Sequence, residues 1–335
     1  MVTIKDISKR CGVSPATVSK ALNGYDDVSP KTLERIRKAA DELHYMPNAA
    51  ARLLKTNRSN NIGVVFEDET LSGLTHDYFS AILNSAKLEL EKHGYDITFI
   101  GQKVGGSSFL EHVRYRKCDG VLIANVDFSA DSVQELIRSE IPTITIDYVF
   151  DNVSSVLSDN VEGGYLLTKY LLDAGHEKIA FIHGEMTSVT SKRLSGFYKA
   201  FSEYGLEVPT EYVVEGRYHD AKVSSELTKK LMELETPPTA ILYPDDYAYI
   251  GGMNELEKMG IRIPDDISVV GYDGINLSQV IRPRLTTYRQ DTDSIGRESA
   301  RKLIEIIEQG KSAVAEQIMV SGQLVEGKSV KRYKA

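Results

Sequence analysis

The sequence predicts a small all-α head that carries a helix-turn-helix, followed by a two-lobed α/β body. In residues 1–60, apolar side chains recur at helical spacing behind Ser-Pro pairs, which favour helix starts. From residue 62 onward, short apolar runs alternate with amphipathic stretches, a pattern typical of βα units with buried parallel strands. The net charge changes sign at the same place. Residues 1–60 are basic, with eleven Lys or Arg against six acids, whereas the 335-residue chain as a whole has a net charge of -8. A basic head on an acidic body predicts that polyanion binding is confined to the head.

The cysteine content and the hydropathy predict a cytoplasmic protein with no membrane partner. Cys11 and Cys118 lie far apart without a repeating spacing, so we expect neither a disulfide framework nor a structural zinc site. The start of the chain lacks the apolar core of a signal peptide, and no stretch approaches the roughly 18 apolar residues of a membrane span.

Three helices are predicted for the head. The first begins near Ile4, and Gly12 can end it in a left-handed conformation. Ser14 and Pro15 suit the N-cap and first position of a second helix, which should run from about Pro15 to Asn23. A second Ser-Pro pair, at Ser29, opens the third.

The second helix should face outward with a polar surface, because its apolar residues Val18, Ala21 and Leu22 can pack against the first helix. The outward residues are small, hydroxyl-bearing or cationic: Pro15, Ala16, Thr17, Ser19 and Lys20. Two helices joined by a tight Gly-containing turn, with such a face on the second, are typical of a recognition helix for the major groove. On the pattern alone, a plain three-helix bundle stays open as an alternative.

Several conspicuous segments are spread along the whole head: Thr3-Ile4-Lys5-Asp6-Ile7-Ser8, Gly12-Val13-Ser14, Thr17-Val18-Ser19, Leu22-Asn23-Gly24, Val28-Ser29-Pro30 and Tyr45-x-Pro47-Asn48-Ala49. Together they strongly resemble the lactose and purine repressor family. The resemblance implies a helix-turn-helix domain over residues 1–46 and a hinge helix with its linker over residues 47–60.

The resemblance also implies roles for single residues on operator DNA. Base edges would be contacted by Pro15, Ala16 and Lys20, of which Lys20 can donate to guanine and the other two can offer only apolar contact. Thr3, Thr17 and Asn23 match positions that bind phosphates. In the hinge helix, Leu54 matches a leucine that wedges between base steps in the minor groove, and Lys55 matches its basic neighbour.

The body is expected to form two stacked α/β lobes over residues 61–335. Predicted strands cover Ile62–Phe66, Ile97–Gly101, Val121–Ala124, Thr143–Ile146, Ile179–Ile182, Ala240–Tyr243 and Ser268–Gly271. Predicted helices include Phe79–His93, Glu162–Ala174 and Ala248–Met259. We expect an N-lobe of about 61–158 and 287–315, a C-lobe of about 159–286 and 316–330, and crossovers near 147–151, 272–274 and 283–287. Ligands of such folds bind at the carboxyl ends of the strands.

Motifs of common enzymes are missing from the sequence. It has no P-loop, no dinucleotide fingerprint after a strand, no His-Glu-x-x-His and no paired-Cys ligand set. The seven histidines are scattered without a matched acid and nucleophile. We therefore expect no enzyme, no cofactor and no metal site.

The body resembles the same repressors and also periplasmic sugar-binding proteins. The similar segments include Asp159-Asn160-x-x-Gly163-Gly164, Arg193-x-x-Gly196-Phe197 and Asp265-Asp266-Ile267-Ser268-Val269-Val270-Gly271-Tyr272-Asp273. The effector positions that the resemblance implies are Tyr78, Phe79, Asp147, Arg193, Tyr218, Asp245, Asp273 and Gln290. Carboxylates and an arginine can clamp hydroxyl groups while aromatic rings cover the apolar face of a sugar, so this set favours a saccharide over a purine. For Arg193, Asp273, Tyr218 and Phe79, a purely structural role is the alternative.

One departure from the family bears on the effector: Asp245-Asp246 stands after Pro244 where Asn-Asp is usual. From these features we expect a homodimer that binds pseudo-palindromic double-stranded operator DNA, because one recognition helix contacts too few base pairs for useful specificity. A mono- or oligosaccharide between the lobes should control operator affinity, most simply as an inducer. A purine or other corepressor is the alternative within the class; a sugar-binding protein or a sugar-acting enzyme are the alternatives outside it.

Overall fold

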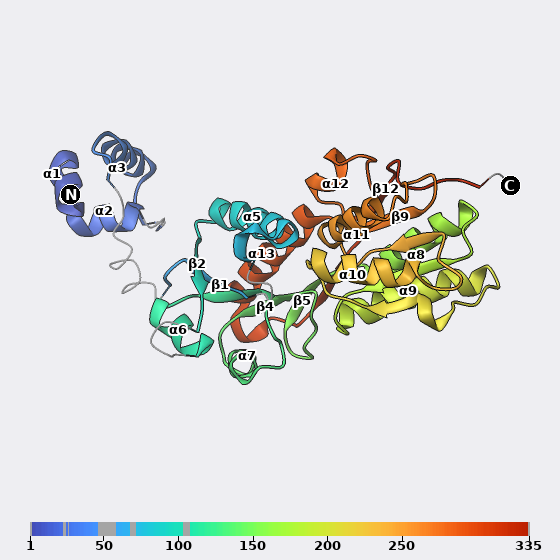
Figure 1. The fold of residues 1–335 in the computed structure, drawn as a ribbon. Helices are drawn as coiled ribbons and strands as arrows, with labels where there is room; N and C mark the ends of the chain where they lie inside the picture. The colour runs from blue at the N-terminus through green and yellow to red at the C-terminus, as the bar shows by residue number, and fades with distance from the viewer. Residues whose placement is uncertain are drawn as a thin grey trace. The chain divides into compact units, whose positions relative to one another are not determined.

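The structure is a computed structural model that describes residues 2–22, 25, 27–45, 58–67, 72–102 and 108–333. Its contacts divide the chain into two compact units, Met1–Ser59 and Asn60–Ala335, and each is described by itself. Figure 1 shows the helical first unit and the mixed α/β second unit. The predicted fold class is confirmed.

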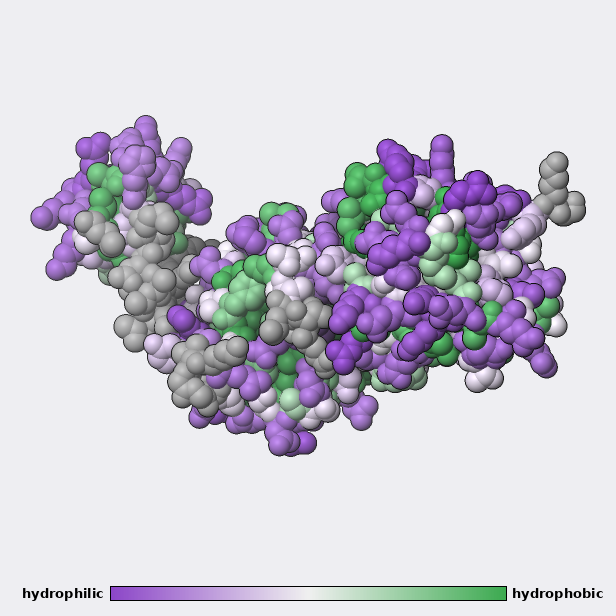
Figure 2. Space-filling view, viewed as in Figure 1, coloured by the Kyte–Doolittle hydropathy of each residue, from purple (hydrophilic) through white to green (hydrophobic). Residues whose placement is uncertain are grey.

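The described part of the head contains the three predicted helices, α1 (Ile4–Cys11), α2 (Pro15–Leu22) and α3 (Pro30–Glu42). Gly12 ends α1 with φ 60°, in the left-handed region that glycine adopts without strain. Ser14 and Ser29 each accept a backbone N–H in the first turn of the following helix. One apolar core joins the helices, formed by Ile7, Cys11, Val18, Ala21, Ile36, Ala39 and Ala40. On the face shown in Figure 2, the head is covered mainly by hydrophilic residues.

The first lobe of the body is built on a parallel sheet with the order β11-β5-β4-β3-β1-β2. Its strands are β1 (Asn61–Phe66), β2 (Asp96–Ile100), β3 (Gly120–Asn125), β4 (Thr143–Ile146), β5 (Ser154–Ser158) and β11 (Gln317–Val320). One face packs against α5 (Asp77–Lys92) and α13 (Thr292–Gln309), and the other packs against α6 (Phe109–Arg116) and α7 (Asp131–Ile137). Figure 1 shows α7 on the side of the sheet opposite α5. Two short 3-10 turns, η1 (Gly73–Thr75) and η3 (Gly310–Ser312), complete this lobe.

The second lobe is built on a sheet with the order β12-β10-β9-β8-β6-β7, in which only the β10–β12 pair is antiparallel among the described strands. Its strands are β6 (Ile179–His183), β7 (Val213–Glu215), β8 (Ala240–Leu242), β9 (Ser268–Asp273), β10 (Thr286–Arg289) and β12 (Gln323–Val325). Helices α8 (Asn160–Asp173) and α9 (Ser188–Glu203) cover one face, and α10 (Ala221–Met232) and α11 (Asp246–Lys258) cover the other. The short α12 (Asn276–Val280) and the turn η2 (Thr210–Tyr212) complete this lobe, and Tyr212 is buried in its core.

The pairing of two late strands corrects the predicted lobe boundaries. Strand β10 pairs in parallel with β9, so residues 287–289 belong to the second lobe and not to the first. Strand β11 pairs with β5, so residues 317–320 belong to the first lobe and not to the second. The described chain therefore crosses between the lobes at 158–160, 289–292 and 320–323, and the first of these crossings coincides with the predicted lobe boundary at about 158/159. The segments 147–151, 272–274 and 283–287, predicted as crossovers, each lie within a single lobe. A short apolar run in the sequence predicts a strand, but it does not say which of the two sheets that strand joins.

Among the described residues, no helix combines the length and the apolar character that a membrane crossing requires.

Candidate DNA-binding face and effector cleft

The outward face of α2 matches the predicted surface. Pro15, Ala16 and Lys20 are exposed, whereas Val18 and Ala21 are buried in the core of the head. Thr17 is half-buried, and its hydroxyl lies 2.9 Å from that of Ser14. The three exposed side chains are thus accessible from the outside of the head.

Two of the predicted DNA-binding residues are engaged by acids within the head. The Lys20 ammonium forms an ion pair with Asp27, and this hydrogen-bonded partner raises the pKa of Lys20. The backbone N–H and the hydroxyl of Thr3 donate to Asp6 Oδ2 at 2.9 and 2.7 Å. The Thr3 hydroxyl donates its single hydrogen to Asp6, whereas the Lys20 ammonium keeps further N–H donors beside its bond to Asp27. Asn23, Leu54 and Lys55 lie outside the described residues.

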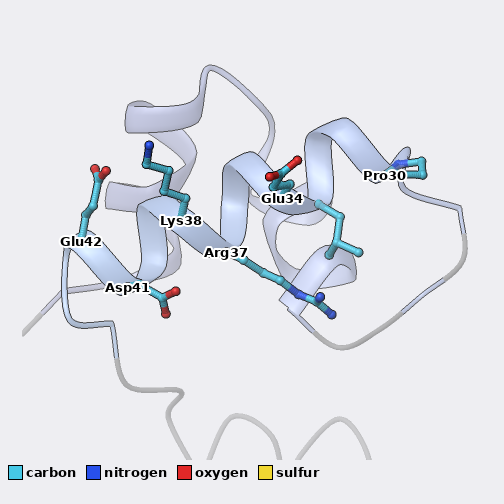
Figure 3. A pocket seen from close by; sticks show the side chains of 7 residues that line it. Pro30, Glu34, Arg37, Lys38, Asp41 and Glu42 are labelled. Carbon is cyan, nitrogen blue, oxygen red and sulfur yellow. The ribbon is translucent and has the colours of Figure 1, made fainter.

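A hollow of about 440 Å³ lies along α3 (Figure 3). Its lining residues are Pro30, Leu33, Glu34, Arg37, Lys38, Asp41 and Glu42. All of them belong to one helix and most are charged, whereas small-molecule sites are concave, mainly apolar and built from several elements. The hollow is therefore a surface feature of the head and not the effector site.

The predicted effector residues lie around the carboxyl ends of the strands in the body. Tyr78 lies in the first turn of α5, Asp147 follows β4, and Asp273 ends β9. Asp147 and Asp273 have φ of 56° and 95°, so both carboxylates project from turns with an unusual backbone. Phe79 follows Tyr78 on α5 of the first lobe. The other four residues come from the second lobe and its crossover: Arg193 on α9, Tyr218 after β7, Asp245 before α11 and Gln290 after β10.

Arg193 is buried and fixed by the second lobe. Its Nε donates to Asn160 Oδ1 and its Nη1 donates to the Pro244 carbonyl, each at 2.8 Å. The guanidinium carbon lies 3.5 Å from the centre of the Tyr272 ring and 5.4 Å from that of Tyr218. Guanidinium groups stack on aromatic faces in this way, so Arg193 is held in a single orientation.

A second group of contacts surrounds Asp147 in the first lobe. The Tyr78 hydroxyl donates to Asp147 Oδ2 at 2.7 Å, and the Ser158 N–H donates to Oδ1 at 2.8 Å. Burial raises the pKa of Asp147 and raises that of Tyr78 well above its usual range. Arg193 from the other lobe lies within electrostatic range of both groups. The two lobes therefore face each other with charged and polar side chains.

Asp273 and Gln290 form a third group, where the second crossover begins. Gln290 Nε2 donates to Asp273 Oδ1 at 2.6 Å, while Gln290 Oε1 is buried and has no hydrogen-bond partner among the described residues. Burial raises the pKa of Asp273 to about 7; Arg193 opposes this shift and the charge of Asp245 adds to it. A buried acceptor without a donor is costly, so a ligand hydroxyl that donates to Gln290 Oε1 would remove that cost.

The other three predicted residues have contacts with a structural purpose. Asp245 accepts from the Ala248 and His219 N–H groups, each at 2.7 Å, and so caps α11. The Tyr218 hydroxyl lies 2.8 Å from that of Thr190. Phe79 is half-buried and packs against the Phe66, His76 and Tyr78 rings. The contacts described for these three residues are thus internal packing and capping contacts.

Sequence analysis missed several residues of the cleft. Asn160 orients Arg193, Tyr272 supports the guanidinium, and Ser158 holds Asp147 and has a buried hydroxyl without a partner in the described structure. Asn160 stands in the conspicuous Asp159-Asn160-x-x-Gly163-Gly164 segment, which could have marked it. Tyr272 also stands in a segment that resembles the family, Asp265–Asp273. Ser158 lies in a strand, where no local signal separates it from core residues.

The described residues contain no group of three or more His, Cys, Asp or Glu positioned to hold a metal ion.

Comparison with known proteins identifies the family. Residues 3–48 match the model for bacterial regulatory proteins of the lacI family, and residues 168–330 match a periplasmic binding protein-like domain. A Mannheimia succiniciproducens protein named HTH-type transcriptional repressor PurR is 34% identical over 341 residues, and 99% of each chain is covered. The chain belongs to the lacI family. As a lacI-family member it is a DNA-binding transcriptional repressor with an effector-binding domain, and its relatives are repressors rather than enzymes.

Other similar proteins also cover nearly the full chain. A Haemophilus influenzae protein, also named PurR, is 32% identical, with 99% of each chain covered. The lac repressor dimer bound to operator and the anti-inducer ONPF has a TM-score of 0.77 at 27% identity and covers 98% of this chain and 99% of its own. The CelR–cellobiose complex has a TM-score of 0.72 at 25% identity and covers 98% and 100%. Repressors of the lacI family bind operator DNA and small-molecule effectors as dimers.

Proposed function

We propose that this repressor binds a sugar between its two lobes and that the sugar lowers its affinity for a pseudo-palindromic operator held by a homodimer. The observation that carries the proposal is the arrangement of Asp147, Asp273 and Gln290 around the buried Arg193. These groups offer several acceptors and one fixed cation to a ligand rich in hydroxyl donors. Two related structures, the CelR–cellobiose complex and an Enterococcus faecium regulator with bound ribose, contain sugars.

On DNA, we assign base contacts to Pro15, Ala16 and Lys20 and phosphate contacts to Thr3, Thr17 and Asn23. The hinge segment 47–60 would pair with that of the second subunit in the minor groove, with Leu54 as the wedge and Lys55 beside it. The effector site would comprise Tyr78, Phe79, Asp147, Arg193, Tyr218, Asp245, Asp273 and Gln290. Because its target is operator DNA, such a regulator would act in the cytoplasm.

A purine corepressor is the second candidate, since the curated relatives at 32–34% identity are named PurR. The two candidates differ in sign as well as in chemistry. A corepressor would raise operator affinity, whereas an inducer would lower it, and either effect requires that the ligand prefer one state of the repressor.

A thermal-shift screen of the purified full chain against pentoses, hexoses, disaccharides and purine bases separates these candidates. A ligand at 100 times its dissociation constant stabilises the native state by about 2.7 kcal/mol, enough for a clear shift of the melting temperature. We expect a sugar to give this shift. Stabilisation by a purine base and by no sugar would overturn the proposal.

The operator sequence can be identified by selecting, from a pool of random duplexes, those that the full chain binds. Fluorescence anisotropy of the selected duplex, with and without the stabilising ligand, then gives the sign of the response. Sedimentation of the protein with and without the duplex shows whether a dimer binds.

A further inference from the structure

Three stacked rings join the two lobes beside the effector cleft. The His76 ring from the first lobe lies parallel to the His219 ring from the second, with centroids 4.2 Å apart and an interplanar angle of 17°. On its other side, the His219 ring stacks on Tyr247, at 3.9 Å and 15°. This stack lies outside the crossover segments 158–160, 289–292 and 320–323. It therefore links the lobes without the help of the covalent chain.

Each ring is held by an element that also supports the cleft. His76 directly precedes α5 and contacts the edge of Phe79 at 4.9 Å. The His219 backbone donates to Asp245 Oδ2 at 2.7 Å and has φ 53°, a conformation that few residues other than glycine adopt. Tyr247 lies in the first turn of α11, which Asp245 caps. The positions of the rings are thus tied to those of Tyr78, Phe79, Tyr218 and Asp245.

Stacking at about 4 Å depends steeply on separation, because ring contacts are lost over an ångström or two. Rotation of one lobe away from the other would separate His76 from His219 and leave each ring attached to its own lobe. His219 and Tyr247 would stay together, since both belong to the second lobe. The His76–His219 contact is accordingly specific to the closed arrangement of the lobes.

We propose that His76, His219 and Tyr247 form an inter-lobe clasp that stabilises the closed cleft and thereby raises effector affinity. The proposal rests on the proposed function, because it places the effector between these lobes. The clasp residues are positioning residues: they set the fraction of protein in the binding-competent state, and apparent affinity scales with that fraction. An aromatic pair of this kind changes an equilibrium by about 2- to 12-fold.

The clasp can be tested without an effector, by measuring the distance between the lobes. Spin labels are placed on cysteines introduced at the exposed residues Glu135 on α7 and Glu257 on α11, after Cys11→Ala and Cys118→Ala. Labelled chain is mixed with excess unlabelled chain, so that distances within one subunit dominate the pulsed electron spin resonance signal. We expect His219→Ala to raise the ratio of the open to the closed distance population by about 2- to 12-fold.

Rescue distinguishes stacking from a general effect of the substitution. His219→Phe keeps a flat ring in the stack and should give the wild-type distance distribution. At the other position, His76→Ala should raise the open population and His76→Phe should give the wild-type distribution. His93→Ala, at the exposed other end of α5, is the matched control and should change nothing. An unchanged distribution in both alanine variants, or failure of both phenylalanine variants to restore it, would overturn the clasp.

A ligand titration extends the test to affinity, with D-ribose and cellobiose as probes. For a probe that binds the wild type, both alanine variants should weaken binding by about 2- to 12-fold and the double variant should show less than the additive loss. Strict additivity would contradict a direct His76–His219 interaction. If neither sugar nor any other saccharide binds the wild type, the proposed function fails, while the distance measurement still decides the clasp.

Discussion

In the head without DNA, the cation that would contact guanine, Lys20, is already paired with Asp27. Both side chains are about half exposed, so water and salt screen the pair strongly. Exchange of Asp27 for a guanine edge is therefore easy, and the head loses little stability when it binds DNA. If Lys20 contacts DNA as proposed, Asp27 would bring a negative charge close to the phosphates.

Asp27→Asn should tighten binding to every duplex by a similar factor, since it removes repulsion from the backbone and frees Lys20. Lys20→Ala should instead weaken binding to the selected operator by roughly tenfold or more relative to scrambled DNA, because a good base contact is worth that much discrimination. Anisotropy titrations at one fixed salt concentration measure both. Equal losses on operator and scrambled DNA for Lys20→Ala would assign Lys20 to a phosphate.

Asp273 makes the stability of the unliganded body depend on pH. Burial raises the pKa of this carboxyl to about 7 in the folded protein, so the native state binds its proton more tightly than the unfolded chain does. The resulting contribution to the free energy of unfolding is fully present below the ordinary pKa of an aspartate and is lost as pH rises through about 7.

Asp273→Asn removes this dependence. As the pH is raised from 5 to 8, the free energy of unfolding of the variant should therefore increase relative to that of the wild type. Urea denaturation at both pH values, without ligand, measures the change. Asp266→Asn is the matched control: Asp266 lies on the surface and pairs with Arg262, which lowers the pKa of the carboxyl, so its contribution stays constant over that range. If the difference in free energy of unfolding between the wild type and Asp273→Asn did not vary with pH, the raised pKa of Asp273 would be contradicted.

Helices α8 and α9 cross at glycines, and this crossing sets the position of Arg193. A Cβ on Gly164 would lie 2.2 Å from the Arg193 carbonyl oxygen, and one on Gly196 would lie 2.1 Å from that of Val161. Both obstacles are backbone atoms, so the helices themselves would have to separate. The glycines are therefore required for packing and not for a turn.

Gly164→Ala should destabilise the body by about 1–3 kcal/mol, as overpacking of a close contact usually does, and should weaken effector binding further because Arg193 moves with α9. Urea denaturation and the ligand titration measure the two effects. Ser195→Ala, on the exposed face of α9, should leave both unchanged. A stable Gly164→Ala protein with normal ligand affinity would show that the crossing adapts without moving Arg193.

Elements differ in how far their sequence predicts them. The head helices could be predicted because their caps and apolar spacing are local, as Gly12, Ser14 and Ser29 illustrate. Strand β5 was missed because Ser-Ser-Val-Leu-Ser does not form an apolar run, although it is fully buried in the sheet. The lobe assignment of β10 and β11 depends on pairing partners 16 and 162 residues away in the sequence, which no local pattern encodes.

The same limit applies within the cleft. Arg193, Asp147 and Asp273 could be selected because the family resemblance covers their segments, and the structure brings them within electrostatic range of one another. Asn160, Tyr272 and the His76–His219 stack depend on packing between distant segments. Residues whose role is to hold another side chain leave little trace in the sequence.

For the molecule as a whole, the proposed function requires that ligand binding and DNA binding be coupled and yet separable. Arg193 lies in the second lobe, inside one of the two compact units, whereas the recognition residues lie in the other. A substitution that removes only the ligand contact should therefore leave the DNA-bound state of the unliganded repressor intact.

Arg193→Ala should abolish the effect of the stabilising ligand on operator binding while operator affinity without ligand stays within about twofold, because no DNA contact is lost. Anisotropy with the selected operator measures both values, and the unliganded affinity doubles as a check of folding. A ligand response of wild-type size would remove Arg193 from the effector site.

The path of the chain through the lobes also decides when each part of the protein can fold. The first lobe needs α13 and β11 to complete its sheet and its core, and β11 ends at Val320, close to the last residue of the chain. During synthesis the ribosome would release the complete head long before either lobe has all of its strands, since domains fold as units from the N-terminus. A nascent chain of this repressor would accordingly present a finished recognition helix before it possesses any means of responding to a ligand.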